Sequence, residues 1–226
     1  MSKKVIAMLI VAMFSTSLVG CGGSSKESNN DSTKNEEINL EEKVNTTEKW
    51  AKDFTLKEFT TTSDELVSNI EKKTKEYGLE YTEEEIVSDD DGETVNRKSV
   101  DVENKNAEKN RLQNMYFSRI IYGESLTAGQ IKMKLLLNFD GKKAIEDNKV
   151  DLGATSIVKY VEILTGVSGR DYSEINEKVL EILKSSKGEG FFQNTIEGLT
   201  ETVTVTDEYI VYSIETDKYE FKKAEQ

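Results

Sequence analysis

The stretch "LQNMYFSRIIYGESLTAGQIKMKLLLNF", residues 112–139, decides the fold. In residues 130–139, every second residue is apolar, as in a half-buried strand. The apolar residues on that face are Ile131, Met133, Leu135, Leu137 and Phe139. Residues 112–122 also fit a helical period, but their aromatic and β-branched content leads us to interpret them as a strand. With "GESLTAG" between the two strands, residues 112–139 predict one long hairpin.

The residues before this hairpin predict a strand, a helix and a second hairpin. In residues 52–60, "KDFTLKEFT", apolar residues such as Phe54 and Leu56 alternate with polar ones, and we interpret the segment as a strand. Thr62 and Glu65 have the spacing of a capping box, and Gly78 stands where a helix commonly ends. Residues 90–92, "DDG", suit a three-residue loop, which sets Val87 opposite Val95 and Glu85 opposite Arg97.

The residues after the long hairpin predict helices and then strands. "FDGKK", residues 139–143, is expected to turn into a short helix, and residues 154–165 form a nearly all-apolar helix ended by Gly166. Asp171 and Glu174 predict a second capping box, followed by an inner stripe of Ile175, Val179, Ile182 and Leu183. Residues 202–221 predict two or three short strands with turns at 207–208 and 217–218.

Strands in runs joined by short turns imply antiparallel pairing. The sequence therefore predicts an α+β fold, with a twisted antiparallel sheet and about three helices packed on one face. Residues 50–226 are long enough for one such domain. A faint helix-then-hairpin pattern recurs in residues 63–100 and 172–215, as in two related halves, but no matched residues accompany the pattern.

The N-terminus has the features of a secretory signal. Lys3 and Lys4 precede the unbroken apolar run "VIAMLIVAMF", residues 5–14, and small and polar residues follow. The four residues Leu18, Val19, Gly20 and Cys21 resemble the lipobox of bacterial lipoproteins. That resemblance covers residues 1–21 only.

The lipobox resemblance implies cleavage after residue 20 and a diacylglycerol on the Cys21 sulfur. Residues 1–20 are then a signal peptide, Cys21 is the lipidation site, and the lipid bilayer is a partner. The expected location is the outer, extracytoplasmic face of the cell membrane. A composition without proline and rich in Lys, Asn, Ile and Glu resembles that of an AT-rich Gram-positive genome.

Residues 21–49 are expected to form a flexible polar tether that begins at the lipidated cysteine. Residues 22–49 contain few apolar side chains and no aromatic ones, so burial cannot offset the entropy of ordering them.

Composition excludes several classes of site. The chain has no histidine and only one cysteine, which excludes Ser-His-Asp catalysis, disulfides within the chain, and ordinary zinc or haem–histidine sites. We expect no cofactor. Loss of residues 1–20 removes two lysines and changes the net charge from −13 to −15, so nucleic acid is not an expected partner.

Eight acids and no base lie in residues 80–93. Asp89, Asp91 and Glu93 are weak candidates for a hard-cation site, because such cations prefer carboxylate oxygens. An EF-hand register with Gly92 in sixth place would put Val87 first and Lys98 twelfth, where oxygen ligands are required. We therefore interpret this segment as a solvated hairpin tip, with no metal site.

The function expected from the sequence is non-enzymatic. A tethered surface module could bind a protein, a peptide or a small ligand, or act as an inhibitor or accessory subunit. The alternative is a carboxylate-based hydrolase acting on cell-wall glycan, which would need two facing carboxylates.

Overall fold

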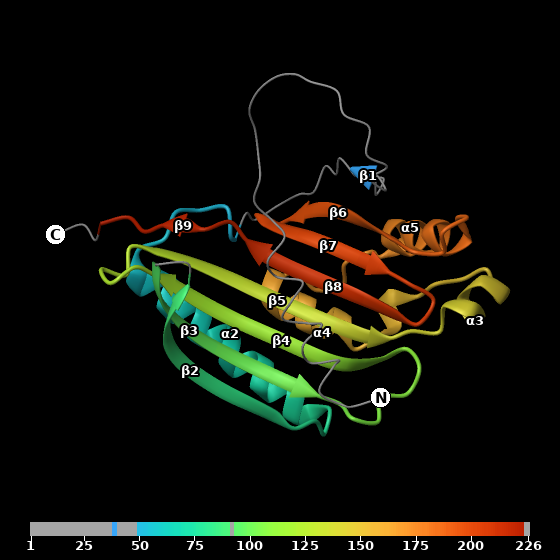
Figure 1. The fold of residues 1–226 in the computed structure, drawn as a ribbon, viewed down its shortest axis with the longest axis horizontal. Coiled ribbons are helices and arrows are strands. Elements are labelled where there is room, and N and C mark those ends of the chain that lie inside the picture. Colours follow the sequence, from blue (N-terminus) through green and yellow to red (C-terminus); the bar gives the residue numbers. More distant parts are fainter. Residues whose placement is uncertain (1–37, 40–48, 91–92, 224–226) are drawn as a thin grey trace, which may run out of the picture. The chain divides into compact units, whose positions relative to one another are not determined.

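The computed structural model describes residues 38–39, 49–90 and 93–223. The chain folds into an open antiparallel sheet, with helices α2 and α4 on one face of it (Figure 1). The α+β fold predicted from the sequence is thus confirmed. The helices are α2 (Leu56–Glu76), α3 (Gly141–Glu146), the 3-10 helix η2 (Leu152–Ala154), α4 (Ile157–Thr165) and α5 (Ser173–Lys184).

The sheet runs in the order β1-β6-β7-β8-β5-β4-β3-β2, and β9 pairs with one end of β5. Its strands are β1 (Ile38–Asn39), β2 (Tyr81–Asp90), β3 (Glu93–Glu103), β4 (Arg111–Tyr122), β5 (Ala128–Asn138), β6 (Gly190–Ile196), β7 (Leu199–Val205), β8 (Tyr209–Thr216) and β9 (Tyr219–Glu220). Strands β2 to β5 run from one edge to the centre, and β6 to β8 run from the other edge to the centre. Each run follows a helix, so the two halves have similar layouts.

The long hairpin is confirmed as β4 and β5 at the middle of the sheet. Its helix-facing side chains are almost fully buried, among them Met115, Phe117, Ile131, Met133 and Leu135. They join one core with the buried residues of α2, α4, α5 and the strands β6 to β8. Gly129 also faces this core, and the site has no room for a side chain. A Cβ at this position would be 2.6 Å from ring atoms of Phe59 and Phe221.

The strand predicted for residues 52–60 is wrong, because α2 begins at Leu56. Thr55 caps the helix in a box with Glu58, so the capping box predicted at Thr62 and Glu65 is also wrong. The buried positions of α2 follow a helical period from Phe59 onward: Phe59, Ser63, Leu66, Val67, Ile70 and Thr74. The predicted helix end is confirmed, since Gly78 follows the last turn with a positive φ of 67°.

The predicted register of the β2–β3 hairpin is wrong by one residue. Asp90 pairs with Glu93, which leaves residues 91–92 as the connection, outside the described residues. Val87 therefore lies opposite Asn96 rather than Val95, and its side chain is 69% exposed.

The predicted capping box of α5 is wrong as well. This helix begins at Ser173, and the Asp171 carboxylate accepts hydrogen bonds from the backbone N and hydroxyl of Ser173, at 2.9 and 2.5 Å. The inner stripe of α5 is buried as predicted. The predicted short helix after Phe139 is α3, and the final strands with their two turns are β7, β8 and β9.

Strands β6 and β1 were not predicted from the sequence. β1 lies within the segment expected to be a tether, and it pairs in parallel with Phe192 and Gln193 of β6. The remaining residues of that segment up to 48, the signal peptide and Cys21 lie outside the described residues.

Candidate functional site

Strand β2 forms one edge of the sheet. All ten of its residues pair with β3 in unbroken antiparallel register, and no described strand pairs with its other side. Five of the ten residues are acids: Glu83, Glu84, Glu85, Asp89 and Asp90. At the opposite edge, β1 covers part of β6. We call β2 and the adjoining face of α2 the acidic edge.

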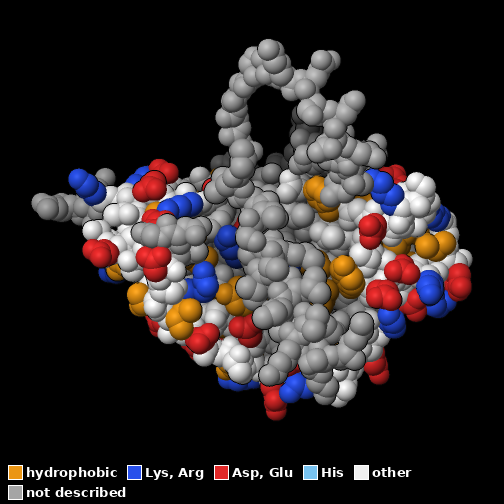
Figure 2. Space-filling model, in the orientation of Figure 1, with side chains coloured by type: hydrophobic (Ala, Val, Ile, Leu, Met, Phe, Trp, Pro, Cys, Tyr) orange, Lys and Arg blue, Asp and Glu red, His pale blue; other side chains and the backbone are white. Residues whose placement is uncertain are grey.

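Successive residues of β2 point to opposite faces of the sheet. Glu83 and Glu85 lie on the face that carries α2, where basic side chains from β3 and β4 meet them. Lys98 Nζ lies 2.8 Å from Glu83 Oε1, and Arg119 Nη2 lies 3.3 Å from Glu85 Oε1. Figure 1 places β2 at the lower edge of the sheet, and Figure 2 shows acidic and basic side chains along this edge on the face turned away from α2.

Arg119 of β4 connects α2 to β2. Its other terminal nitrogen, Nη1, lies 3.1 Å from Oδ1 of Asp64 on α2. The Arg119 side chain is only 6% exposed, and both of its carboxylate partners are more than half exposed. A guanidinium this deeply buried depends on its partners, because an unpaired buried charge carries a large desolvation cost.

Two carboxyl groups share a hydrogen bond at this edge. Partial burial, and next the hydrogen bond to Glu83 and the charge of Glu83, raise the pKa of Glu71. The hydrogen bond from Lys98 lowers the pKa of Glu83. Glu71 on α2 therefore keeps its proton to a higher pH and donates it to the Glu83 carboxylate on β2.

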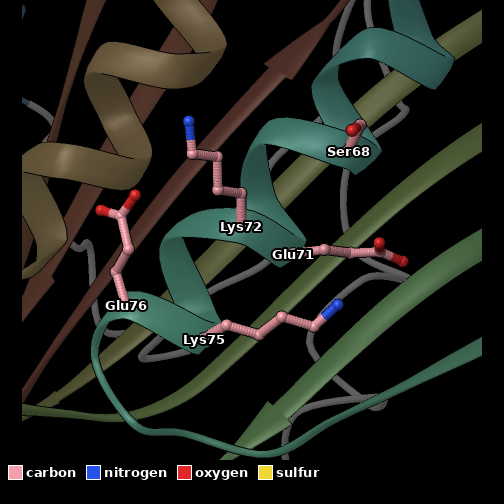
Figure 3. A pocket seen from close by; sticks show the side chains of 5 residues that line it. All are labelled: Ser68, Glu71, Lys72, Lys75 and Glu76. Atoms are coloured by element: carbon pink, nitrogen blue, oxygen red, sulfur yellow. The ribbon is translucent and has the colours of Figure 1, made fainter.

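An open groove of about 510 Å³ runs along α2 beside this carboxyl pair and is lined by Ser68, Glu71, Lys72, Lys75 and Glu76. Figure 3 shows Glu71 and Lys75 pointing from α2 toward the strands, whereas Lys72 and Glu76 point to the other side of the helix. The Lys75 ammonium lies 5.3 Å from the ring centroid of Tyr81, at the start of β2. All five lining residues are polar or charged, so the groove suits a polar partner rather than an apolar ligand.

The weak cation candidates from the sequence are not brought together. Asp89 and Glu93 lie on opposite faces of the hairpin, because Asp89 pairs with Thr94 and Glu93 with Asp90. Glu93 forms a two-point ion pair with Lys218, at 3.0 and 2.8 Å. Asp91 lies outside the described residues, and within the described ranges no group of three or more acids is arranged to hold a metal ion.

No family model, curated protein or solved structure matches this chain. Within the part of the chain that the structure describes, no helix is both long and apolar enough to span a bilayer.

A second polar cluster, which sequence reasoning missed, lies in the core between β7, β8 and the segment before α5. Glu201 is fully buried and accepts hydrogen bonds from Arg170, Tyr212 and Asn194. Burial raises the pKa of Tyr212, and the negative charge of Glu201 raises it further. Because the Arg170 guanidinium neutralises the Glu201 carboxylate within the core, we assign this cluster a structural role rather than a binding role.

Proposed function

We propose that this protein is a lipid-anchored binding module on the outer face of the cell membrane, and that it binds its partner through the acidic edge. The anchor is supported by the residues Leu18 to Cys21 and the apolar run before them. The observation that carries the binding proposal is β2 itself, a ten-residue edge strand with no described strand on its outer side.

An unpaired strand edge presents a row of backbone donors and acceptors, and proteins use such edges to bind extended segments of other chains. The ion pairs of Glu83 and Glu85 hold β2 against its neighbours, so the edge is pre-ordered. A pre-ordered surface loses less conformational entropy on binding than a flexible one. The absence of histidine and the net negative charge agree with a non-enzymatic module that uses no cofactor and binds no nucleic acid.

A carboxylate-based hydrolase is the second candidate, and the Glu71–Glu83 pair is the observation that favours it. Two carboxyls that share a proton have unequal pKa values, as an acid and a base require. However, hydrogen-bonded oxygens lie about 2.5–3.0 Å apart, whereas glycosidase carboxyls stand about 5–9.5 Å apart around the scissile bond. The Glu83 side chain is also 40% exposed, so water is not excluded from the pair.

The anchor is tested by the variant Cys21→Ser. We expect the variant to leave the membrane fraction or to keep its leader uncut, as judged by fractionation and mass spectrometry. Normal processing with full membrane retention would contradict the anchor.

The binding surface is tested by placing a photocrosslinking residue at position 84 or 87 of β2, and at position 146 of α3 as the control. In cells that produce the protein, we expect the same partner to be crosslinked from both β2 positions and not from position 146. Crosslinks of equal yield from all three positions, or from position 146 alone, would contradict the acidic edge as the binding surface.

The hydrolase alternative is tested with Glu71→Gln and Glu83→Gln. We expect the wild-type chain to show no turnover of peptidoglycan, polysaccharide, peptide or ester substrates. Turnover that disappears in either amide variant, with the fold intact, would establish the enzyme in place of the binding module.

A further inference from the structure

We infer that β2 is the docking strand for an extended, cationic segment of a protein partner, which adds to the sheet edge as a further strand. This inference rests on the proposed binding function and names the partner's chemistry. It is drawn from the unpaired edge, the charges on it and the apolar residue at its centre.

The edge is long and regular. Ten residues at about 3.3 Å each give roughly 33 Å of continuous edge. Proteins often protect such an edge with a proline or a bulge. The chain contains no proline, and the β2–β3 register is unbroken, unlike that of β4 and β5, which shifts between Leu112 and Asn114. The remaining protection is negative charge, which does not repel a basic strand.

Ion pairs with β3 and β4 compensate the negative charge on the helix face of β2. On the helix face, Lys98 and Arg119 already pair with Glu83 and Glu85. On the other face, Glu84 is exposed and forms no ion pair with any residue that the structure describes. Partial burial raises the pKa of nearby Asp101, and the negative charge of Glu84 raises it further, so the two carboxyls repel each other. A lysine or arginine opposite Glu84 would offset this repulsion.

A second copy of this chain does not satisfy the same edge. An antiparallel pairing of β2 with itself about Ile86 would set Glu83 directly opposite Asp89. Like charges in directly opposed positions destabilise a strand pair. A basic occupant avoids this repulsion, and an apolar residue in it would cover Val87, which is 69% exposed.

The test uses the full chain as expressed and a fluorescent peptide with blocked ends, Thr-Lys-Thr-Lys-Val-Lys-Thr-Lys-Thr. Its control is the same peptide with every backbone nitrogen methylated, which keeps the charge and removes the donors. Because each strand hydrogen bond contributes about 1 kcal/mol, we expect the control to bind at least about tenfold more weakly by fluorescence anisotropy. We also expect the unmodified peptide to slow amide hydrogen exchange in β2.

Matched charge reversals complete the test. Glu84→Lys should weaken binding of the unmodified peptide by about fivefold, because an opposed pair of unlike charges becomes a pair of like charges. Glu146→Lys, which makes the same change of charge on α3, should leave the affinity unchanged. Equal binding of the methylated peptide, or equal effects of the two reversals, would reduce the interaction to diffuse attraction and overturn the inference.

Absence of binding by either peptide at millimolar concentration would also overturn the inference. If crosslinks from positions 84 and 87 are still found, the binding module stands without strand addition. If neither peptide binding nor crosslinks are found, the proposed function fails together with the inference.

Discussion

Arg170 and Glu201 form a two-point ion pair inside the protein, with Nη1–Oε1 at 2.5 Å and Nη2–Oε2 at 2.9 Å. The Glu201 side chain is fully buried, and that of Arg170 is 10% exposed. The pair fastens the segment between α4 and α5 to β7, on the helix-bearing face of the sheet. It therefore couples the position of α5 to the strands beneath it.

We expect Arg170→Met to lower the free energy of unfolding by about 3–5 kcal/mol, because it leaves a buried carboxylate without its counter-charge. The double variant Arg170→Met with Glu201→Met should be more stable than this single variant, since neither charge remains. Urea unfolding of both variants and the wild type measures the difference. A double variant less stable than Arg170→Met would contradict the account.

The cap of α2 gives a second prediction. Thr55→Ala should lower the free energy of unfolding by about 1 kcal/mol, because it removes the side-chain acceptor of the Glu58 backbone N–H. Thr62→Ala, inside the same helix, should change stability by a few tenths of a kcal/mol at most, in the stabilising direction. Thermal unfolding of the two variants compares them, and a larger loss for Thr62→Ala would place the helix start where the sequence alone predicted it.

The Glu71–Glu83 pair predicts a pH dependence. Because the pKa of Glu71 is raised in the folded state, the unfolded chain releases its proton first as the pH rises from about 4.5. Between the ordinary glutamate pKa and the raised one, ionisation of Glu71 therefore lowers the free energy of unfolding as the pH increases. Glu71→Gln should remove this loss, so the variant gains stability relative to wild type from pH 4 to pH 7, measured by urea midpoints.

Glu76→Gln on the same helix is the control for that titration. The hydrogen bond from Lys73 lowers the pKa of Glu76, so its contribution is present above the ordinary pKa and is lost as the pH falls. The control should thus lose stability relative to wild type as pH rises, opposite to Glu71→Gln. An effect of Glu71→Gln that does not vary with pH would argue against the shared proton.

The N-terminal limit of the folded domain can be tested at Trp50. Its ring is buried, Nε1 donates to the Leu164 carbonyl at 2.8 Å, and its backbone N donates to the Glu197 carbonyl at 2.9 Å. A chain of residues 49–226 should unfold cooperatively. A chain that begins at residue 52 should lose about 3–5 kcal/mol, as removal of a buried Trp side chain does. Circular dichroism melts of the two chains decide the matter, and equal melting temperatures would show that Trp50 lies outside the cooperative unit.

The long hairpin could be predicted because the apolar residues of one face recur at every second position of its second strand, and because its first strand is rich in aromatic and β-branched residues. The start of α2 was missed because residues 52–60 alternate as a strand does and Thr62 with Glu65 has the spacing of a capping box, and because a buried position of its second turn, Ser63, is polar. Ser63 donates to the Thr60 carbonyl, and Thr74 donates to the Ile70 carbonyl, so their hydroxyls are satisfied within the helix. Strand β6 was missed for a similar reason, since buried Asn194 stands between Phe192 and Ile196.

The candidate site could be predicted only as a run of acids in residues 80–93. Which of these acids meet a base depends on the hairpin register and on where α2 packs. Arg119 is distant in sequence from both Asp64 and Glu85, so no local pattern indicates their contact. The same holds for Arg170 and Glu201, which only the assembled sheet brings together.

The central pairing of β5 with β8 has a consequence for how the domain folds. Residues 132–138 pair there with residues 209–215, whereas β2 to β5 pair with neighbours along the chain. Closing the long intervening loop costs entropy before any of its contacts form. The two edge-to-centre runs of strands are thus expected to assemble early, and their meeting at β5 and β8 to be the slow step. Until that step, the edges of β5 and β8 stay unpaired, and we expect the nascent chain to be most prone to aggregate.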